Sequence, residues 1–332
     1  MQSNSSAIAR EKTVDFLVKY GVYIVFVILC VIFARGNPNF LTASNLVLLL
    51  QQSAPMILGV IGMTFVMMDG AIDVSAGSNM YLSAAVCGVL LTEFNKAGVN
   101  NNSLSIYILV FLVAIVVGCS IGVVNGIMVA RFKMVPFIAT VIMTSIARGI
   151  GLYITNAKMI TLNTLGFKLS DKVYGGISIQ IYIALVLILI FHFVLHGTKY
   201  GLHLKAQGNN KQAAQKMGIN TTRNTLTAYI ICGGLCGLAG IMSAGSTGSI
   251  PSYFANGNEF VIIPAAVLGG TSLFGGKGNI IPGAIIGMIL VNTIVNGLTM
   301  MDANPYVYTI IRGAIIFLAV MLDSINYKGE LR

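Results

Sequence analysis

The chain contains no tryptophan, and only 9% of its 332 residues are charged. Hydrophobic residues make up 56% of the sequence, and the mean hydropathy is +0.86. A soluble domain of this length needs a far larger polar surface, so the scarcity of charge excludes one and indicates an integral membrane protein. Only short polar segments separate the apolar runs, which leaves no room for a second, soluble domain.

Several kinds of chemistry are also absent from the sequence. No segment fits the phosphate-binding pattern G-x-x-x-x-G-K-[ST], so ATP chemistry would need another chain. No nucleophile, base and orienting residue occur together, which gives an enzyme little support. His192 and His196 have a spacing that can hold zinc, but no third ligand is near them in sequence. We therefore predict neither a cofactor nor a metal site.

Ten apolar segments are candidate membrane spans, at residues 20–34, 45–68, 77–94, 105–130, 134–155, 179–196, 225–247, 261–274, 280–299 and 306–323. No small-residue cleavage site follows the first segment, so we expect it to be retained. The eighth is short and runs into "GGTSLFGGKG", which indicates a broken or re-entrant element. We predict an all-α polytopic membrane protein with eight to ten transmembrane helices.

Basic residues predict the orientation of the chain, because Lys and Arg concentrate in cytoplasmic loops. With the N-terminus inside, the cytoplasmic segments hold thirteen of the twenty basic residues, the outer loops hold five, and Arg148 and Arg312 fall within spans. Both termini are therefore expected in the cytoplasm. The predicted organisation is one transmembrane domain, residues 1–332, with cytoplasmic segments at 1–19, 197–224 and 324–332.

Small residues and a short internal sequence repeat predict how the helices pack. Glycines recur at helical spacing in three spans, which predicts packing seams at Gly118, Gly122 and Gly126, at Gly233, Gly237 and Gly240, and at Gly283 and Gly287. The order VNG, Pro, RG occurs from Asn125 to Arg148 and again from Asn296 to Arg312. The two copies run in opposite directions in this topology, which is typical of the inverted repeats of transporters.

The polar loop at residues 197–224 contains "KQAAQKM", which is predicted to be a short helix between Asn210 as N-cap and Gly218 as C-terminal stop. Ala213, Ala214 and Met217 are expected on one face of it. This loop would either rest on anionic lipid headgroups or dock into a groove of a soluble partner.

Two acids, Asp69 and Asp73, lie in "MMDGAIDVSAGS" between two apolar runs. A charged Asp at the centre of a bilayer costs about 2.5–3.5 kcal/mol, so these acids should face water, cations or helix N-termini. Asp73 or Ser75 is favoured as a cap of the helix that starts near Ala76. A position along a substrate path is the alternative.

The other polar residues within spans also have two interpretations. Arg148 and Arg312 have either a symmetric structural role or a contact with substrate. Asparagines at 79, 125, 292 and 296 could equally form a polar conduit or bond between helices. The candidate path residues are Asp69, Asp73, Ser75, Asn79, Asn125, Arg148, Asn292, Asn296 and Arg312.

Four motifs occur in order along the chain: "GMTFVMMDGAIDVSAGS" (62–78), "VNGIMVARFKMVPFIATVIMTSIARGI" (124–150), "YGLHLKAQGNNKQAAQKMGIN" (200–220) and "AAVLGGTSLFGGKGNIIPGAIIG" (265–287). With them nearly the whole chain resembles the permease subunits of bacterial ATP-binding-cassette importers for ribose, xylose, arabinose and galactosides, within the wider branched-chain-permease superfamily. The chain departs from the family pattern at Ala71, Val74 and Ala76, and has "AQGNN" where the family usually has "AIGGN".

The resemblance implies a function and a set of partners. The chain would be an inner-membrane permease for a monosaccharide, working with a cytoplasmic ATP-binding-cassette ATPase, an extracytoplasmic sugar-binding protein and a second permease copy, and with no nucleic acid. It places ATPase coupling in the polar loop, at Gly201, Asn209, Ala213, Ala214, Met217 and Gly218. The alternatives are an ion-driven secondary transporter coupled through Asp69 and Asp73, or an importer permease for nucleosides or branched-chain amino acids.

Overall fold

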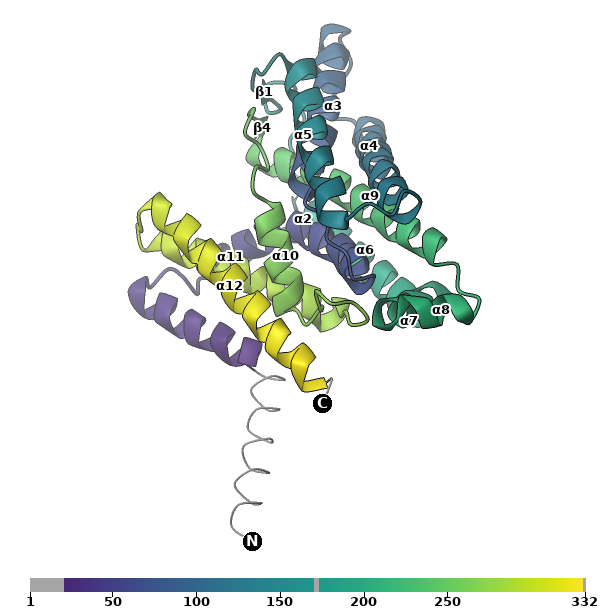
Figure 1. Cartoon of the computed structure of the whole chain (residues 1–332). Coiled ribbons are helices and arrows are strands. Elements are labelled where there is room, and N and C mark those ends of the chain that lie inside the picture. Colours follow the sequence, from purple (N-terminus) through teal and green to yellow (C-terminus); the bar gives the residue numbers. More distant parts are fainter. Residues whose placement is uncertain (1–20, 170–172, 331–332) are drawn as a thin grey trace.

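The computed structural model describes residues 21–169 and 173–330, and most of them are helical (Figure 1). A first helix covers Gly21–Gly36. The longer helices that follow are α2 (Ala43–Met68), α3 (Ala76–Lys96), α4 (Leu104–Ala130), α5 (Pro136–Thr155), α6 (Ile179–Gly197), α9 (Thr221–Thr247) and α12 (Pro305–Glu330). The shorter ones are α7 (Lys199–Asn209), α8 (Lys211–Lys216), α10 (Glu259–Leu268) and α11 (Ile285–Met300), the last of which follows a π-helical turn, η1 (Ile280–Ala284).

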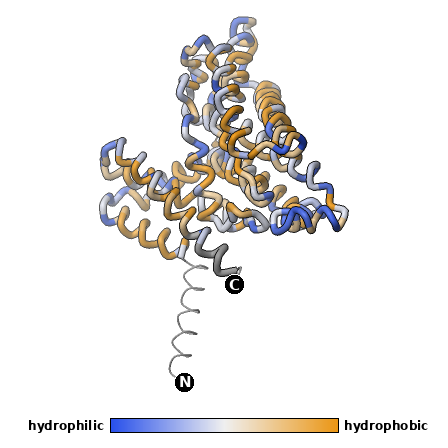
Figure 2. Tube along the Cα trace, viewed as in Figure 1, coloured by the Kyte–Doolittle hydropathy of each residue, from blue (hydrophilic) through white to orange (hydrophobic). Residues whose placement is uncertain are grey.

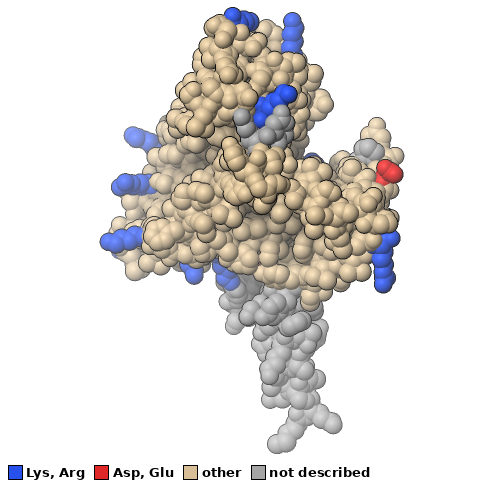
Figure 3. Space-filling view, turned by 180° about the vertical axis from the view of Figure 1, so that it is seen from behind, with Lys and Arg blue, Asp and Glu red and all other residues tan. Residues whose placement is uncertain are grey.

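Each of the ten predicted apolar segments contains a helix, so the all-α polytopic fold is confirmed. Six of the helices are long and apolar enough to cross a membrane. Apolar residues follow the helices in Figure 2, and polar ones gather around α7 and α8 and at the opposite end of the molecule. Most of the face shown in Figure 3 is uncharged, with Lys and Arg mostly at its margins.

The eighth segment is broken, as its length predicts. Its helix, α10, has ten residues and is therefore about 15 Å long, half the thickness of a bilayer core. Residues 269–279 then run without helical structure to η1, and Gly270, Gly275 and Gly276 in this stretch have positive φ angles. Part of this backbone is bonded to the rest of the protein: the Gly276 N–H donates to the Met68 carbonyl at the end of α2 (2.9 Å), whereas Gly270, Phe274 and Lys277 are exposed.

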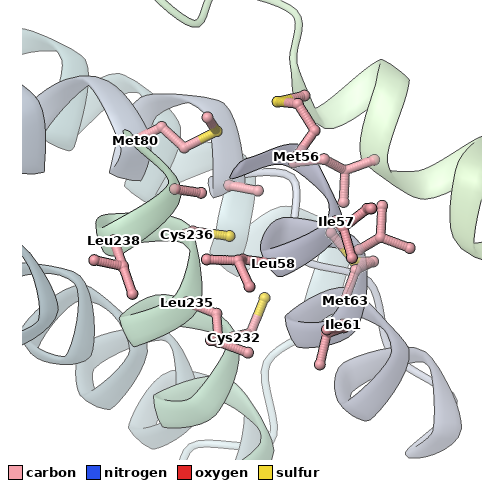
Figure 4. Close-up of a cluster of buried hydrophobic side chains, with 14 of the residues drawn as sticks. Met56, Ile57, Leu58, Ile61, Met63, Met80, Cys232, Leu235, Cys236 and Leu238 are labelled. Carbon is pink, nitrogen blue, oxygen red and sulfur yellow. The ribbon is translucent and has the colours of Figure 1, made fainter. Parts of the chain in front are cut away.

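The two most buried long helices, α2 and α9, form the centre of the molecule. Between them lies a core rich in sulfur, to which Met56, Met63, Cys232 and Cys236 contribute (Figure 4). All five cysteines of the chain are free thiols. Flexible thioethers and small thiols fill irregular gaps between helices, so these residues act as packing groups.

The glycine seams are confirmed as close helix contacts. A Cβ atom placed on Gly118 or Gly122 of α4 would collide with the carbonyl oxygen of Gly233 or Tyr229 on α9. On α11, a Cβ at Gly287 would collide with the Ala265 carbonyl of α10. Helices pack this closely in a membrane only where small residues let the two backbones approach.

The helices also pack in an order that repeats. Helix α4 packs on α9 while α11 packs on α2, α3 contacts α5 while α10 contacts α12, and α3 contacts α9 while α10 contacts α2. If α2, α3, α4 and α5 are taken to correspond to α9, α10, α11 and α12, each contact in these three pairs maps onto the other. This is the pattern expected of two structurally repeated halves. Each half has an irregular segment after its first helix. We call residues 69–75, between α2 and α3, the first break, and residues 248–258, between α9 and α10, the second break.

Two short strand pairs complete the fold. The strand β1 (Ile160–Thr161) pairs antiparallel with β4 (Ser249–Ile250), and β2 (Val173–Tyr174) pairs with β3 (Ile177–Ser178). The first pair joins the loop after α5 to the second break, and thus connects the two halves at the end of the molecule away from α7 and α8 (Figure 1).

Candidate functional site

Asp69 begins the first break and faces the polar loop. Its carboxylate accepts hydrogen bonds from Thr225 Oγ1 of α9 (2.6 Å) and from Gln207 Nε2 of α7. The buried Gln207 side chain also donates to Thr225 Oγ1 (3.0 Å) and accepts from Asn224 Nδ2 (3.3 Å). The carboxylate therefore connects the end of α2 to the loop, a partnership that sequence reasoning did not foresee.

Asp73 lies deeper in the first break, where its side chain is 1% exposed. One of its oxygens, Oδ1, accepts from the Ser75 N–H (2.9 Å), the Ser75 hydroxyl (2.5 Å) and Asn125 Nδ2 (3.4 Å). Asn125 of α4 also donates to Ser75 Oγ (2.8 Å). These three residues, which the sequence proposed separately, form one buried polar cluster.

The predicted helix cap at this cluster is wrong in its geometry. Ser75 occupies the N-cap position of α3 but makes no capping hydrogen bond with its side chain. Asp73 binds the N–H of Ser75 itself, and no N–H within α3. The reason is that Ser75 has a helical backbone conformation, and its hydroxyl is used by Asp73 and Asn125. The carboxylate still lies just ahead of the α3 N-terminus, where the helix dipole favours a negative charge.

The remaining asparagines of the predicted path bond between helices, which is one of their two interpretations. Asn79 donates from α3 to the carbonyls of Gly118 (3.4 Å) and Gly233 (3.2 Å). On α11, Asn292 donates to Ser53 Oγ of α2 (2.9 Å). Asn296 and Asn45 exchange two amide hydrogen bonds of 3.0 Å each. Their amides join α2, α3, α4, α9 and α11.

Arg148 and Arg312 both face the second break. Arg148 Nη1 donates to the Phe254 carbonyl (2.8 Å) and the Ser252 carbonyl (3.4 Å), and its guanidinium lies 4.6 Å from the centroid of the Tyr81 ring. Arg312 Nη1 would be 3.2 Å from a Cβ atom placed on Gly257. The two arginines thus contact one break, so they do not have equivalent positions in the two halves.

Glu259, the first residue of α10, is a site residue that the sequence analysis missed. Its side chain is 7% exposed and interacts electrostatically with both Arg148 and Arg312. Its Oε2 fills the place that a Cβ on Gly77 would take at the start of α3. A signal was present, because Glu259 is the one acid between residues 172 and 301 and directly precedes the short eighth segment.

The polar loop forms two helices, α7 and α8, of which the sequence predicted the second. The N-cap is confirmed, since Asn210 Oδ1 accepts from the Ala213 N–H (2.9 Å), and Gly218 follows α8 with a φ of +82°. Gly201 is buried against the Leu195 backbone, and Asn209 lies against Gly276.

The expected apolar face of α8 needs a correction. Ala214 is 2% exposed and faces the protein, whereas Ala213 is exposed and Met217 is 81% exposed. Because the Ile219 N–H bonds back to the Ala214 carbonyl, the chain after α8 folds over Ala214. The exposed apolar side chains at α8 are therefore those of Ala213 and Met217, and in α7 Leu202 is also exposed.

Among the described residues, no group of three His, Cys, Asp or Glu side chains lies close enough to hold a metal ion. His192 and His196 stack at the end of α6 with ring centroids 4.4 Å apart.

Comparison with known proteins gives matches along nearly the whole chain. Residues 45–320 match the family described as branched-chain amino acid transport system / permease component. The chain is 32% identical to the ribose import permease protein RbsC of Escherichia coli (strain K12), over 95% of this chain and 96% of that protein. It is 34% identical to RbsC of Bacillus subtilis (strain 168), over 95% and 96%. It is 31% identical to the galactose/methyl galactoside import permease protein MglC of E. coli (strain K12), over 98% and 99%. No solved structure matches the chain.

Proposed function

Because this chain belongs to the family of permease components of the branched-chain amino acid transport system, we propose that it is the membrane-spanning subunit of an ATP-driven importer for a monosaccharide. The observation that carries this proposal is the end-to-end similarity to relatives named for the import of ribose and galactose. The polytopic fold, with six helices suited to an inner membrane, supports it.

The partners follow from the proposal. A separate ATPase hydrolyses ATP, because this sequence has no phosphate-binding loop. We propose that it docks on the exposed surface of Ala213 and Met217 from the cytoplasm, the side on which both termini also lie. A sugar-binding protein delivers the cargo from the opposite side, and a second copy of the chain completes the pore.

The substrate path is proposed to run past the two breaks. Irregular backbone at membrane depth is stable only inside protein or beside water, so breaks in helices are where a polar cargo can pass. The polar groups available there are Asp73, Ser75 and Asn125 at the first break, and Arg148, Arg312 and Glu259 at the second. Asp69 is better suited to coupling, because its carboxylate is already bound by Gln207 of the polar loop.

Reconstituted transport tests the proposal. The permease is co-expressed with its partner ATPase and sugar-binding protein, and the purified complex is placed in liposomes loaded with ATP. We expect uptake of a labelled pentose or hexose that requires ATP and the binding protein.

Two results would contradict this function. Uptake driven by a proton or sodium gradient without ATP would indicate the secondary transporter instead. Uptake of leucine that no sugar competes with would indicate an amino acid cargo, in line with the name of the family. The ATPase remaining bound through purification is the control for correct assembly.

A further inference from the structure

Helix α5 contacts both breaks through one line of polar side chains. These side chains are Thr140, Thr144 and Arg148, which are spaced four residues apart and therefore lie along one face of the helix. Eight residues of α-helix separate the first from the last, a distance of about 12 Å along the axis.

At one end of this line, two threonines bind both backbone groups of a single residue in the first break. The Val74 N–H donates to Thr140 Oγ1 (3.1 Å), and the Thr144 hydroxyl shares its proton between the Val74 carbonyl (3.1 Å) and the Thr140 carbonyl of its own helix (2.9 Å). Val74 lies directly between Asp73 and Ser75. The buried polar cluster is thus fixed to α5 through its own backbone.

At the other end, Arg148 binds the second break. Its two hydrogen bonds go to the backbone carbonyls of Phe254 and Ser252, and its guanidinium is held over the Tyr81 ring of α3. Bonds to backbone fix the position of the chain whatever the side chains beside it are, so α5 holds both breaks in place.

The rest of α5 has one packed stripe and one exposed face. Ala139, Met143 and Ala147 are buried against neighbouring helices, whereas apolar side chains such as those of Ile138 and Ile142 are exposed. A continuous helix held on one face by side-chain bonds, and otherwise in contact with apolar surroundings, can shift without distorting its own backbone hydrogen bonds.

We propose that Thr140 and Thr144 are positioning residues of the transport cycle, which fix the first break to α5 so that its displacement is passed through Arg148 to the second break. The path from the polar loop is contiguous: Gln207 binds Asp69, the first break leads from Asp69 to Val74, and α5 leads from Val74 to Phe254. This inference rests on one part of the proposed function, namely that ATP hydrolysis by a partner subunit drives the movement.

The test measures movement of the second break and requires no sugar. Tyr253 is 74% exposed and adjacent to Phe254, so a Tyr253→Cys permease, assembled with its ATPase in nanodiscs, is labelled with maleimide with and without ATP. We expect ATP to change the labelling rate. In the double variant Thr140→Val, Thr144→Val, which removes both hydroxyls at nearly constant volume, we expect that change to fall about tenfold while ATP is still hydrolysed.

A matched control uses the same substitution elsewhere. Thr299 of α11 is exposed and bonds only to the Val295 carbonyl of its own helix, so Thr299→Val should label like the parent. Thr140→Ser with Thr144→Ser retains both hydroxyls and should also label like the parent.

The proposal is overturned if the valine variant keeps the full ATP-dependent change, or if the parent shows no change while it hydrolyses ATP. If the double variant does not assemble, Thr144→Val alone is measured, and an undiminished response then overturns the proposal. Failure of sugar uptake with an intact labelling response would instead count against the proposed cargo alone.

Discussion

Single residues decide how the buried polar groups are satisfied. Asp73 lies in the first break and Asn125 in α4, and neither has a local sequence signal that identifies its partner. The sequence correctly singled out both, because polar groups are costly inside a membrane protein. It could not predict that Ser75 would be shared between them, since that depends on how α4 packs beside the first break. For the same reason the bond between Gln207 and Asp69, 138 positions apart, could not be predicted.

Asp73→Ala should destabilise the protein. The substitution removes the acceptor of the buried Ser75 N–H and of the Ser75 hydroxyl, and leaving a buried donor unpaired costs about 1–3 kcal/mol. We expect a lower thermal unfolding midpoint in detergent and less permease in the membrane.

Asp73→Asn is the matched control for this prediction. The asparagine keeps an acceptor oxygen, so it should lose less stability than the alanine variant. A fully stable Asp73→Ala protein that has lost uptake would contradict the structural role and place Asp73 on the substrate path.

At the scale of helices, hydropathy was sufficient for the apolar elements and insufficient for the polar ones. The ten apolar segments all contain helices because burial or lipid contact selects that pattern. Helix α7 was missed because its sequence is polar and includes Gly201 and Gly208, so its stability depends on contacts with α6 and α9. The orientation of α8 was predicted incorrectly because Ala213 and Ala214 are adjacent, and only the packing against α9 decides which one faces inward.

The two adjacent alanines make a sharp test of the docking surface. Ala213→Trp adds bulk to an exposed position, so the permease should reach the membrane in normal amount but lose its co-purifying ATPase. Ala214→Trp adds the same bulk to a buried position and should lower the amount of folded permease, because overpacking costs about 1–3 kcal/mol.

Quantitative blotting of membranes and pull-down of the ATPase separate these two effects. An Ala213→Trp permease that binds its ATPase as well as wild type would exclude this surface of α8 as the docking site.

The glycine seam between α4 and α9 can be tested in the same way. Gly122→Ala places a methyl group against the Tyr229 carbonyl, and we expect it to lower the free energy of unfolding by about 1–3 kcal/mol. Gly149→Ala of α5 is the control, since a Cβ there meets nothing within 4 Å. It should be neutral or stabilising by up to about 1 kcal/mol, because alanine favours helices. Equal effects of the two substitutions on thermal unfolding would contradict the close packing.

For the whole molecule, the sequence predicts an orientation that contacts within the chain cannot determine. The distribution of Lys and Arg predicts that α7 and α8 lie in the cytoplasm. In the structure, the second break lies at the end of the molecule away from α7 and α8, where β1 and β4 pair.

Labelling in intact cells tests this orientation. Tyr253→Cys is expected to react with a membrane-impermeant maleimide added outside, and Ala213→Cys only after the cells are opened. Each residue is exposed in the structure, so poor reactivity would not follow from burial. Reaction of Ala213→Cys in intact cells would reverse the topology and, with it, the proposed side of ATPase docking.

The backbone-to-backbone contact of α4 with α9 limits which parts of the molecule can rearrange. No side chains lie between Gly118 and Gly233 to be repacked, so neither helix can rotate or slide past the other without a steric collision. If the proposed pore alternates between outward-open and inward-open forms, α4 and α9 should therefore move together as one unit, and the pivot points should lie in the irregular segments on either side of that unit.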